Sequence, residues 1–178
     1  LTEAQRETLR GWMANTKTMT LRMYLRSVIS GQDERPYRNL TVSIVNANPV
    51  FDDATPLTYE DTNAATVAVT GDNQKIVQNV SNLVATITAG ATAMKSATIS
   101  NYKVTIGTET QTVTTPSAVD FATVNLIENT PITVTATDSR GNTVSFSRTV
   151  TILPWQPPRA VISAARVNNF ESDTTVKA

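Results

Sequence analysis

Carboxylates and hydroxyls are the reactive groups that this sequence offers, because its 178 residues include neither cysteine nor histidine. Without cysteine there is no thiolate nucleophile, disulfide or Cys-based metal site. Without histidine the chain lacks the side chain best suited to acid–base catalysis near neutral pH, which is also the commonest metal ligand. No serine lies in a Gly-x-Ser-x-Gly nucleophile motif. We therefore predict that the protein is not an enzyme, and assign no catalytic, cofactor-binding or metal-binding residue.

Five acidic residues are the strongest remaining candidates for a site, and they fall in predicted polar loops near one end of a predicted domain: Asp52, Asp53, Glu60, Asp61 and Asp72. Clustered oxygen ligands could hold Ca²⁺ and stiffen a domain junction, but the sequence has no Asp-x-Asp-x-Asp-Gly loop. A pair of carboxylates could also cleave glycosides, although no aromatic-lined cleft is predicted beside them. The simplest interpretation is a set of solvated loop carboxylates.

The charge balance and the short apolar runs exclude two classes of partner, nucleic acid and a membrane interior. Lys and Arg total 15, as do Asp and Glu, so the formal net charge is zero. That balance gives no electrostatic basis for binding nucleic acid, whose phosphates must be neutralised. No apolar run approaches the roughly 18 residues that a membrane span requires, so we predict no membrane insertion.

The elements that would position these side chains are mostly β-strands. The first exception is Thr2-Glu3-Ala4-Gln5, a capping box that predicts one short helix through about Asn15. From Thr18 the apolar period changes to two, which predicts a strand with Met19, Leu21, Met23 and Leu25 on one face. A second strand, with Leu40, Val42 and Ile44 on one face, follows a polar loop. The two are predicted to form a hairpin.

Seven further runs of short, mostly alternating sequence follow within about 100 residues, which is typical of an immunoglobulin-like sandwich. They are 66–69, 83–88, 97–106, 110–114, 118–124, 132–137 and 143–152. The predicted core includes Val119, Phe121, Val124 and Phe146. The last two runs form a hairpin around the Asp138–Asn142 turn, in which Gly141 supplies a positive φ. We interpret Asp138 and Arg140 as turn chemistry on a solvated loop, and not as a functional pair.

An internal repeat organises the chain into tandem units. Residues 149–157 match residues 41–49 at an offset of 108, and Ile132 and Val134 match Leu21 and Met23 at an offset of 111. We predict the C-terminal part of one Ig-like domain at 1–47 (the short helix plus a hairpin), a complete Ig-like domain at about 48–155, and the opening strand of a third at 156–178. The fold class is therefore all-β. The Pro-rich linker at 154–158 should be extended and semi-rigid, with Trp155 packed at the junction.

Several blocks of sequence, spread over nearly the whole chain, also occur together in a known group of proteins. They are Leu1–Arg6, Asn48–Pro49, Tyr59–Asn63, Val69–Gln74, Thr137–Thr143, Thr149–Trp155 and Arg166–Glu171. Together they resemble the minor structural (tail) proteins of siphophages that infect Gram-positive bacteria, in their Ig-like repeat region. The Asp-Ser-Arg-Gly-Asn turn is common in such domains, and its combination with Leu-Pro-Trp at the linker is more specific.

This resemblance implies an extracellular place in the virion, at the tail tip, baseplate or side fibre. It also implies a role in reaching the host surface, with other phage tail and baseplate proteins as partners and no catalytic residues. Two alternatives stay open. One is a carbohydrate-binding module that contacts host cell-wall polysaccharide through exposed aromatic residues such as Tyr59, Tyr102 or Trp155. The other is a bacterial surface adhesin built from Ig repeats. Homo-oligomerisation also remains open.

Overall fold

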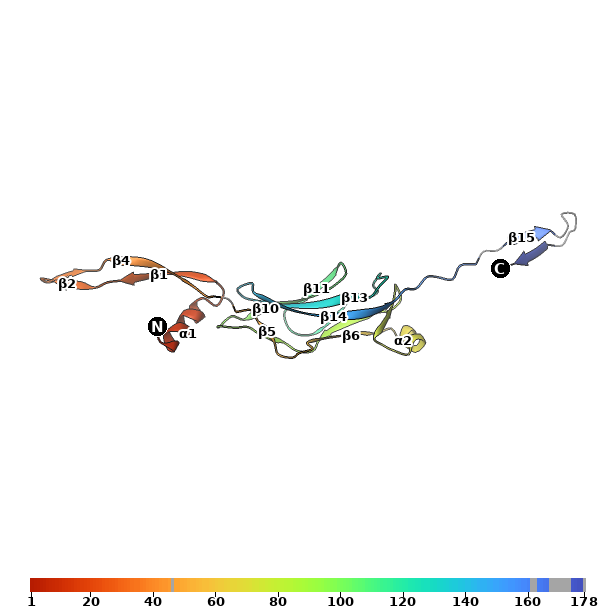
Figure 1. Cartoon of the computed structure of the whole chain (residues 1–178), viewed down its shortest axis with the longest axis horizontal. Coiled ribbons are helices and arrows are strands. Elements are labelled where there is room, and N and C mark those ends of the chain that lie inside the picture. The colour runs from red at the N-terminus through yellow and green to blue at the C-terminus, as the bar shows by residue number, and fades with distance from the viewer. Residues whose placement is uncertain (46, 161–162, 167–173, 178) are drawn as a thin grey trace.

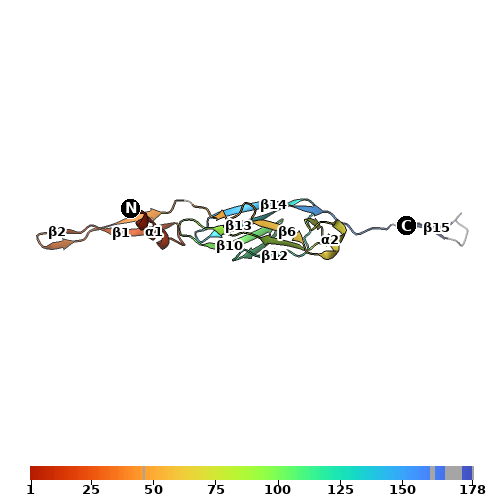
Figure 2. The same cartoon turned by 90° about the horizontal axis from the view of Figure 1, so that it is seen from below.

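The molecule is elongated, with a helix and hairpin, a β-sandwich and a short second hairpin following one another along its long axis (Figures 1 and 2). This computed structural model describes residues 1–45, 47–160, 163–166 and 174–177. Helices are few and short, so the all-β class is confirmed. No helix in those ranges is long and apolar enough to cross a membrane.

Helix α1 (Glu3–Trp12) begins with the predicted capping box. Thr2 Oγ1 accepts a hydrogen bond from Gln5 N at 3.3 Å, and Thr2 N donates to Gln5 Oε1 at 2.9 Å. These two bonds satisfy donors that the first turn of a helix leaves without partners. Met13 caps the C-terminal end of the helix and its side chain is fully buried, whereas Trp12, the last helical residue, is exposed.

The predicted N-terminal hairpin is confirmed. Strand β1 (Thr18–Tyr24) pairs antiparallel with β4 (Tyr37–Ser43), and the ribbon continues through β2 (Ser27–Ile29) and β3 (Gln32–Glu34). Residues directly opposite each other in an antiparallel pair share a face. The pairs Met19–Val42 and Leu21–Leu40 therefore build an apolar face, and Thr20–Thr41 lies on the polar one.

The sandwich consists of two main sheets (Figures 1 and 2). One has three strands in the order β12-β8-β6, and the other has five in the order β11-β10-β13-β14-β7, with β7 parallel to β14. A short pair, β5 with β9, lies at the end nearer α1. The bounds are β5 (Val50–Phe51), β6 (Leu57–Asp61), β7 (Lys75–Val77), β8 (Leu83–Ile87), β9 (Ala91–Thr92), β10 (Ile99–Ile106), β11 (Glu109–Val113), β12 (Ala118–Asp120), β13 (Thr130–Asp138) and β14 (Thr143–Leu153).

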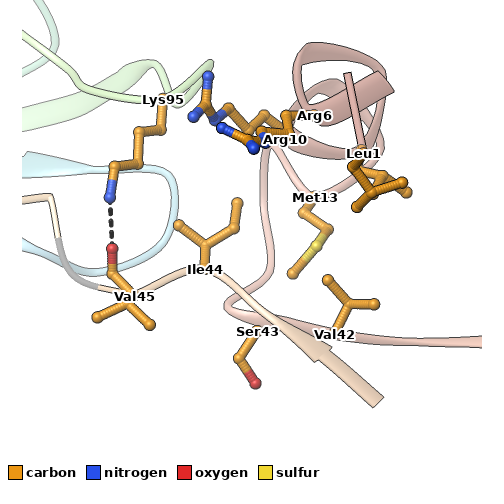
Figure 3. A pocket seen from close by; sticks show the side chains of 10 residues that line it. Leu1, Arg6, Arg10, Met13, Val42, Ser43, Ile44, Val45 and Lys95 are labelled. Carbon is orange, nitrogen blue, oxygen red and sulfur yellow. Dashed lines mark hydrogen bonds between the residues drawn. The ribbon is translucent and has the colours of Figure 1, made fainter. Parts of the chain in front are cut away.

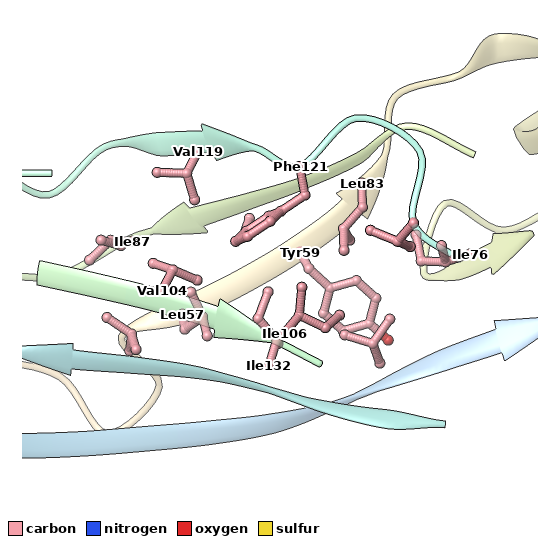
Figure 4. Packing of buried hydrophobic residues seen from close by; sticks show 14 of the residues in the cluster. Leu57, Tyr59, Ile76, Leu83, Ile87, Val104, Ile106, Val119, Phe121 and Ile132 are labelled. Carbon is pink, nitrogen blue, oxygen red and sulfur yellow. The ribbon is translucent and has the colours of Figure 1, made fainter. Parts of the chain in front are cut away.

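A single hydrophobic cluster fills the space between the two sheets, as alternation on each strand requires (Figure 4). Its members include Leu57, Tyr59, Leu83, Ala85, Ile87, Tyr102, Val104, Ile106, Ile132, Val134, Ala136, Val150 and Ile152. The predicted core residues Val119, Phe121 and Val124 are buried there too. Phe146 packs against the cluster but is only partly buried, so it lies at the margin of the core.

Two of the predicted strands are wrong, because one is a helix and the other is shorter than predicted. Residues 66–69 belong to helix α2 (Ala64–Thr70), because Asn63 caps its N-terminus through Ala65 N at 3.0 Å and Gly71 ends it at φ +67°. The run 118–124 is a strand only to Asp120, since Ala122 turns the chain with φ +53°. The sequence did not predict strands β5, β6, β7 and β9. The residues of β6 were assigned to a polar loop, whereas in the structure every second one is buried.

The two long hairpins share one register, as the sequence repeat requires. Leu21 pairs with Leu40, and the residues at their matched positions, Ile132 and Arg148, also pair. The offsets of 111 and 108 residues were obtained from each strand separately, so the agreement of the pairing is independent support for the repeat.

After the linker, β15 (Ser163–Arg166) pairs antiparallel with β16 (Thr174–Lys177). Residues 167–171, which belong to one of the resemblance blocks, lie outside the described residues.

Candidate functional site: a junction between helix α1 and the sandwich

The β13–β14 turn stands at the end of the sandwich that faces α1, and Asp138 holds its shape. Asp138 Oδ1 accepts hydrogen bonds from Arg140 N at 2.9 Å and Asn142 N at 2.7 Å, and Oδ2 accepts from Asn142 Nδ2 at 2.9 Å. Gly141 adopts φ +77°, as predicted. Asp138 is only 2% exposed, so its carboxylate is devoted to this turn.

Arg140 projects from this turn to the backbone of two other segments. Its Nε donates to Met13 O at 2.9 Å and its Nη2 to Arg10 O at 3.4 Å, both at the C-terminal end of α1. On the other side Nη1 donates to Met94 O at 3.1 Å and Nη2 to Lys95 O at 2.5 Å. The side chain is 7% exposed. One guanidinium therefore bridges α1 and the loop between β9 and β10.

The chemistry of this arrangement follows from the end of a helix. The last carbonyl groups of a helix form the negative end of its dipole, and each carbonyl oxygen can accept two hydrogen bonds. At the end of α1, Arg10 O accepts a backbone bond from Met13 N at 3.1 Å and Met13 O one from Thr16 N at 3.2 Å, which leaves each a second lone pair for a side chain. A guanidinium presents five N–H donors in a fixed planar fork, so it can satisfy several carbonyls while opposing that dipole. Every hydrogen-bond acceptor of the Arg140 side chain among the described residues is a backbone carbonyl. Arg140 therefore fixes the position of a backbone, which is a structural task.

Neighbouring groups complete this contact region, which we call the Arg140 junction: the turn 138–142, the end of α1 at 10–14, and the loop 94–98. Ser139 Oγ donates to Ala14 O at 2.6 Å and accepts from Thr98 N at 3.2 Å. Lys95 Nζ donates to Val45 O at 2.5 Å, just before the sandwich begins (Figure 3). Met13, fully buried, packs beside Val42 and Ile44 in the same region.

The predicted solvated loop around Asp138 and Arg140 is thus wrong, because both side chains are buried, Asp138 within its own turn and Arg140 against the end of α1. The predicted turn correctly explains Asp138 and Gly141, but the prediction did not include α1 as the partner of Arg140. No local pattern identifies that partner, since Arg140 and Met13 are 127 residues apart. The signal in the sequence was Arg140 itself, because Asp138 and Gly141 form the turn without any need for an arginine between them.

The five candidate carboxylates do not form a cluster. Asp52 lies at the β5–β9 end, where its Oδ1 accepts from Thr92 Oγ1 at 2.6 Å, and Asp53 caps the next turn through Thr55 N at 2.7 Å. Asp61 and Asp72 lie by α2, at the opposite end (Figure 1). Within the described ranges no group of three or more acidic side chains is placed to hold a metal ion. The expectation that they share one end of the domain is wrong.

Asp61 is a buried structural carboxylate, not a loop residue. Its oxygens accept hydrogen bonds from Ser81 Oγ at 2.6 Å, Asn63 N at 2.9 Å and Asn82 N at 3.0 Å, and from the Thr66 hydroxyl. Burial acts to raise the pKa of Asp61, but these hydrogen bonds outweigh it and hold the pKa below its ordinary value. The network ties β6 to α2 and to the start of β8.

The aromatic residues proposed for glycan contact include both buried and exposed side chains. Tyr59 and Tyr102 are buried in the core, so their predicted exposure is wrong. Their hydroxyls bind backbone: Tyr59 Oη donates to Gln74 O at 3.1 Å, and Tyr102 Oη accepts from Ala91 N at 2.9 Å. Trp155 is 46% exposed and lines an apolar depression with α2.

An exposed aromatic pair that the sequence reasoning missed lies on the polar face of the first hairpin. The rings of Tyr24 and Tyr37 have centroids 6.0 Å apart, and the Arg22 guanidinium lies 4.4 Å from the Tyr37 centroid. Antiparallel pairing of the two strands places Tyr24 opposite Tyr37, so the sequence contained enough information to find this pair.

Comparison with known protein families indicates the origin of this protein. Residues 2–178 match a family described as a siphovirus protein of unknown function (DUF859). The chain belongs to this family. Comparisons with curated proteins and with solved structures gave no match. The siphovirus origin agrees with the resemblance noted in the sequence and favours a phage protein over a bacterial adhesin.

Proposed function

We propose that this siphovirus protein is a structural component of the virion, an Ig-like spacer in the tail, baseplate or fibre that helps the phage reach its host. The observation that carries the proposal is the Arg140 junction. Arg140 donates two hydrogen bonds to the end of α1 and two to the 94–98 loop of the sandwich. These bonds fix the direction in which one module continues into the next, which an extended spacer requires.

The strand order supports an Ig-like interpretation of the sandwich. In an Ig-type fold, strands A, B and E share one sheet and C, F and G the other. In chain order, β6, β8 and β12 match the first set, and β10, β13 and β14 the second. Helix α2 then occupies the connection between β6 and β7.

We further propose the tandem organisation predicted from the repeat: the end of one Ig-like domain at 1–47, a complete domain at about 48–155 and the start of another from 156. The shared register of the two long hairpins supports the first boundary. Other tail and baseplate proteins would be the partners, and the protein would act outside the cell as part of the particle.

Electron microscopy of purified particles tests the location. Antibody fragments raised against the sandwich and coupled to gold are expected on the tail tip, baseplate or side fibres. A particle preparation that contains no copies of the protein, or gold confined to the capsid, would refute the structural tail proposal. An antibody against a capsid protein serves as the control for labelling efficiency.

Carbohydrate binding remains the second candidate, now on different residues. The exposed aromatic surfaces of Tyr24, Tyr37 and Trp155 support it, because sugars stack on exposed rings. Titration with host cell-wall polysaccharide should quench Trp155 or shift its emission if it binds there. Tyr24→Ala should abolish binding if the hairpin pair is the site, and unchanged spectra together with no retention on immobilised polysaccharide would dismiss this candidate.

A further inference from the structure

The apolar face of the first hairpin is exposed over most of its length. Near its outer end Met23 is 57% exposed and Leu25 is 70% exposed, and Leu40 on the paired strand is exposed as well. Helix α1 covers only the base of this face, where Leu9 and Met13 approach Leu21 and Val42. Exposed apolar faces of this kind mark surfaces that another structure covers.

The matched hairpin of the sandwich shows what such a face is built to contact. Ile132 and Val134, which correspond to Leu21 and Met23, are fully buried, and so is Val150, which corresponds to Val42. They pack in one cluster with side chains of β6, β8 and β12. In the same register, and with apolar residues at the positions of Leu21, Met23 and Val42, one hairpin is covered by a three-stranded sheet, whereas no sheet among the described residues covers the other. Leu40 is different, because its matched residue Arg148 is exposed as well.

Charge indicates which occupant fits. Residues 17–44 hold five basic side chains, at Lys17, Arg22, Arg26, Arg35 and Arg38, and two acidic ones, at Asp33 and Glu34. Strands β6, β8 and β12 hold three acidic residues and no Lys or Arg. Most of these charges lie outside the docking faces, since Arg22 lies on the polar face of the hairpin and Glu60 and Asp120 are exposed on the sandwich. On the apolar face the register places Arg38 opposite Met23, so a sheet without Lys or Arg fits there, whereas a second copy of the hairpin would bring another Arg38.

We propose that the apolar face of β1–β4 docks a three-stranded sheet of the β6–β8–β12 kind, apolar and without Lys or Arg, supplied by a preceding repeat of the tandem array. This inference rests on the tandem organisation of the proposed function. It adds the surface, the register and the chemistry of the partner. The face buried would be that of Met19, Leu21, Met23, Leu25, Leu40 and Val42, together with Arg38, which pairs with Met23.

Methionine oxidation tests the burial directly, because the four methionines form an internal scale. Met13 is buried, Met19 half-buried, Met23 57% exposed and Met94 39% exposed. Hydrogen peroxide oxidises methionine according to its accessibility. In the 178-residue chain Met23 should react fastest. In the complete gene product its rate relative to Met94 should fall by about tenfold or more. An unchanged ratio would overturn the proposal.

The same measurement identifies other occupants. If Met23 is protected only in assembled particles and not in the complete protein alone, the cover is another virion protein and the proposed occupant is wrong. If the 178-residue chain forms dimers by light scattering and Met23 is protected in them, the occupant is a second copy. Gold labelling of particles reports where the protein lies, and methionine oxidation reports whether the hairpin face is buried. The tail location and the docking of this face can therefore each fail without the other.

A pair of charge substitutions gives a second measurement. Met23→Lys should lower the melting temperature of the complete protein, because it places an ammonium in the docked interface. It should leave the 178-residue chain unaffected, where residue 23 faces solvent. Thr20→Lys, on the polar face of the same strand, should be neutral in both. Equal tolerance of both substitutions in the complete protein would contradict docking on this face.

Discussion

The two boundaries of the sandwich are built in different ways. On the side of α1, a buried arginine, a serine hydroxyl and a lysine donate to backbone carbonyls of the neighbouring module. On the other side, residues 154–160 form an extended linker. Among the described residues one hydrogen bond, from Trp155 N to Gln78 Oε1 at 3.3 Å, ties this linker to the sandwich. The first boundary is polar and directional, and the second depends on proline stiffness and one aromatic side chain.

The comparison teaches how an array can combine fixed and adjustable joints. Hydrogen bonds weaken steeply away from their preferred geometry, so several of them converging on one guanidinium select a single orientation. Apolar contact is non-directional and tolerates many orientations. We therefore expect the α1 side to behave as one body with the sandwich and the linker side to vary in angle.

The largest expected effect separates the stability of the sandwich from that of its boundaries. Asp61→Ala removes an acceptor that serves four donors, two buried hydroxyls and two backbone N–H groups. We expect a loss of about 3–5 kcal/mol in the free energy of unfolding, measured by urea denaturation. Asp53→Ala, an exposed turn carboxylate, is the matched control. A loss below about 1 kcal/mol would contradict the structural role of this network.

The same carboxylate predicts how stability depends on pH. The folded-state pKa of Asp61 is lowered by its hydrogen bonds, so its contribution is fully present above the unfolded pKa of about 3.9. It is lost as pH falls from there through the folded pKa, because protonation removes the acceptor. Asp61→Asn should make the acid limb of the stability profile shallower. A profile with the same slope as the wild type would assign acid unfolding to other groups.

The next effect concerns the polar boundary itself. Arg140→Ala leaves the carbonyls of Arg10, Met13, Met94 and Lys95 without this donor, and we expect a loss of about 2–4 kcal/mol in the docking of α1. Hydrogen exchange should accelerate in the last turn of α1 and remain slow in β10 and β13. Arg148→Ala, on the same hairpin, is the control. Global acceleration would mean that the two modules unfold together.

A smaller effect is expected at Ser139, which contributes one hydroxyl to the same boundary. Ser139→Ala should cost about 1–2 kcal/mol, because the hydroxyl donates to Ala14 O and accepts from Thr98 N. Ser100→Ala, an exposed serine on β10, should be neutral. If Ser139→Ala costs as much as Arg140→Ala, the hydroxyl and the guanidinium act as one unit, which a double substitution would reveal.

The smallest effect is expected at the linker. Trp155 is partly exposed and outside the core cluster, so Trp155→Ala should change the stability of the sandwich by less than about 0.5 kcal/mol. Denaturation followed by circular dichroism measures this without the Trp signal. A loss above about 2 kcal/mol would show that the second boundary is as firmly packed as the first.

Local patterns in the sequence were enough to predict the elements whose causes are local. The capping box before α1, the alternation of β13 and β14, and the positive φ of Gly141 depend on neighbouring residues only. The pairing of β1 with β4 was predicted from two alternating runs separated by a polar loop, which is also a local pattern.

Features that depend on distant partners could not be predicted in this way. Asp61 and Arg140 both look like loop residues until the chain folds Ser81 onto one and Met13 onto the other. The run 66–69 has the composition of a strand, and its helix is decided by the cap at Asn63 and by Asp61. The family match is to proteins of unknown function, so it added origin but no residue roles.

The central claim is that Arg140 fixes the direction of the first module, and electron–electron distance measurements test it most directly. The absence of cysteine allows spin labels at Thr20→Cys and Thr112→Cys across the first boundary, and at Thr112→Cys and Thr175→Cys across the linker. We predict a narrow distance distribution for the first pair, a broader one for the second, and a broadening of the first alone in Arg140→Ala. A first distribution as broad as the second in the unsubstituted chain, or unaffected by Arg140→Ala, would contradict the account.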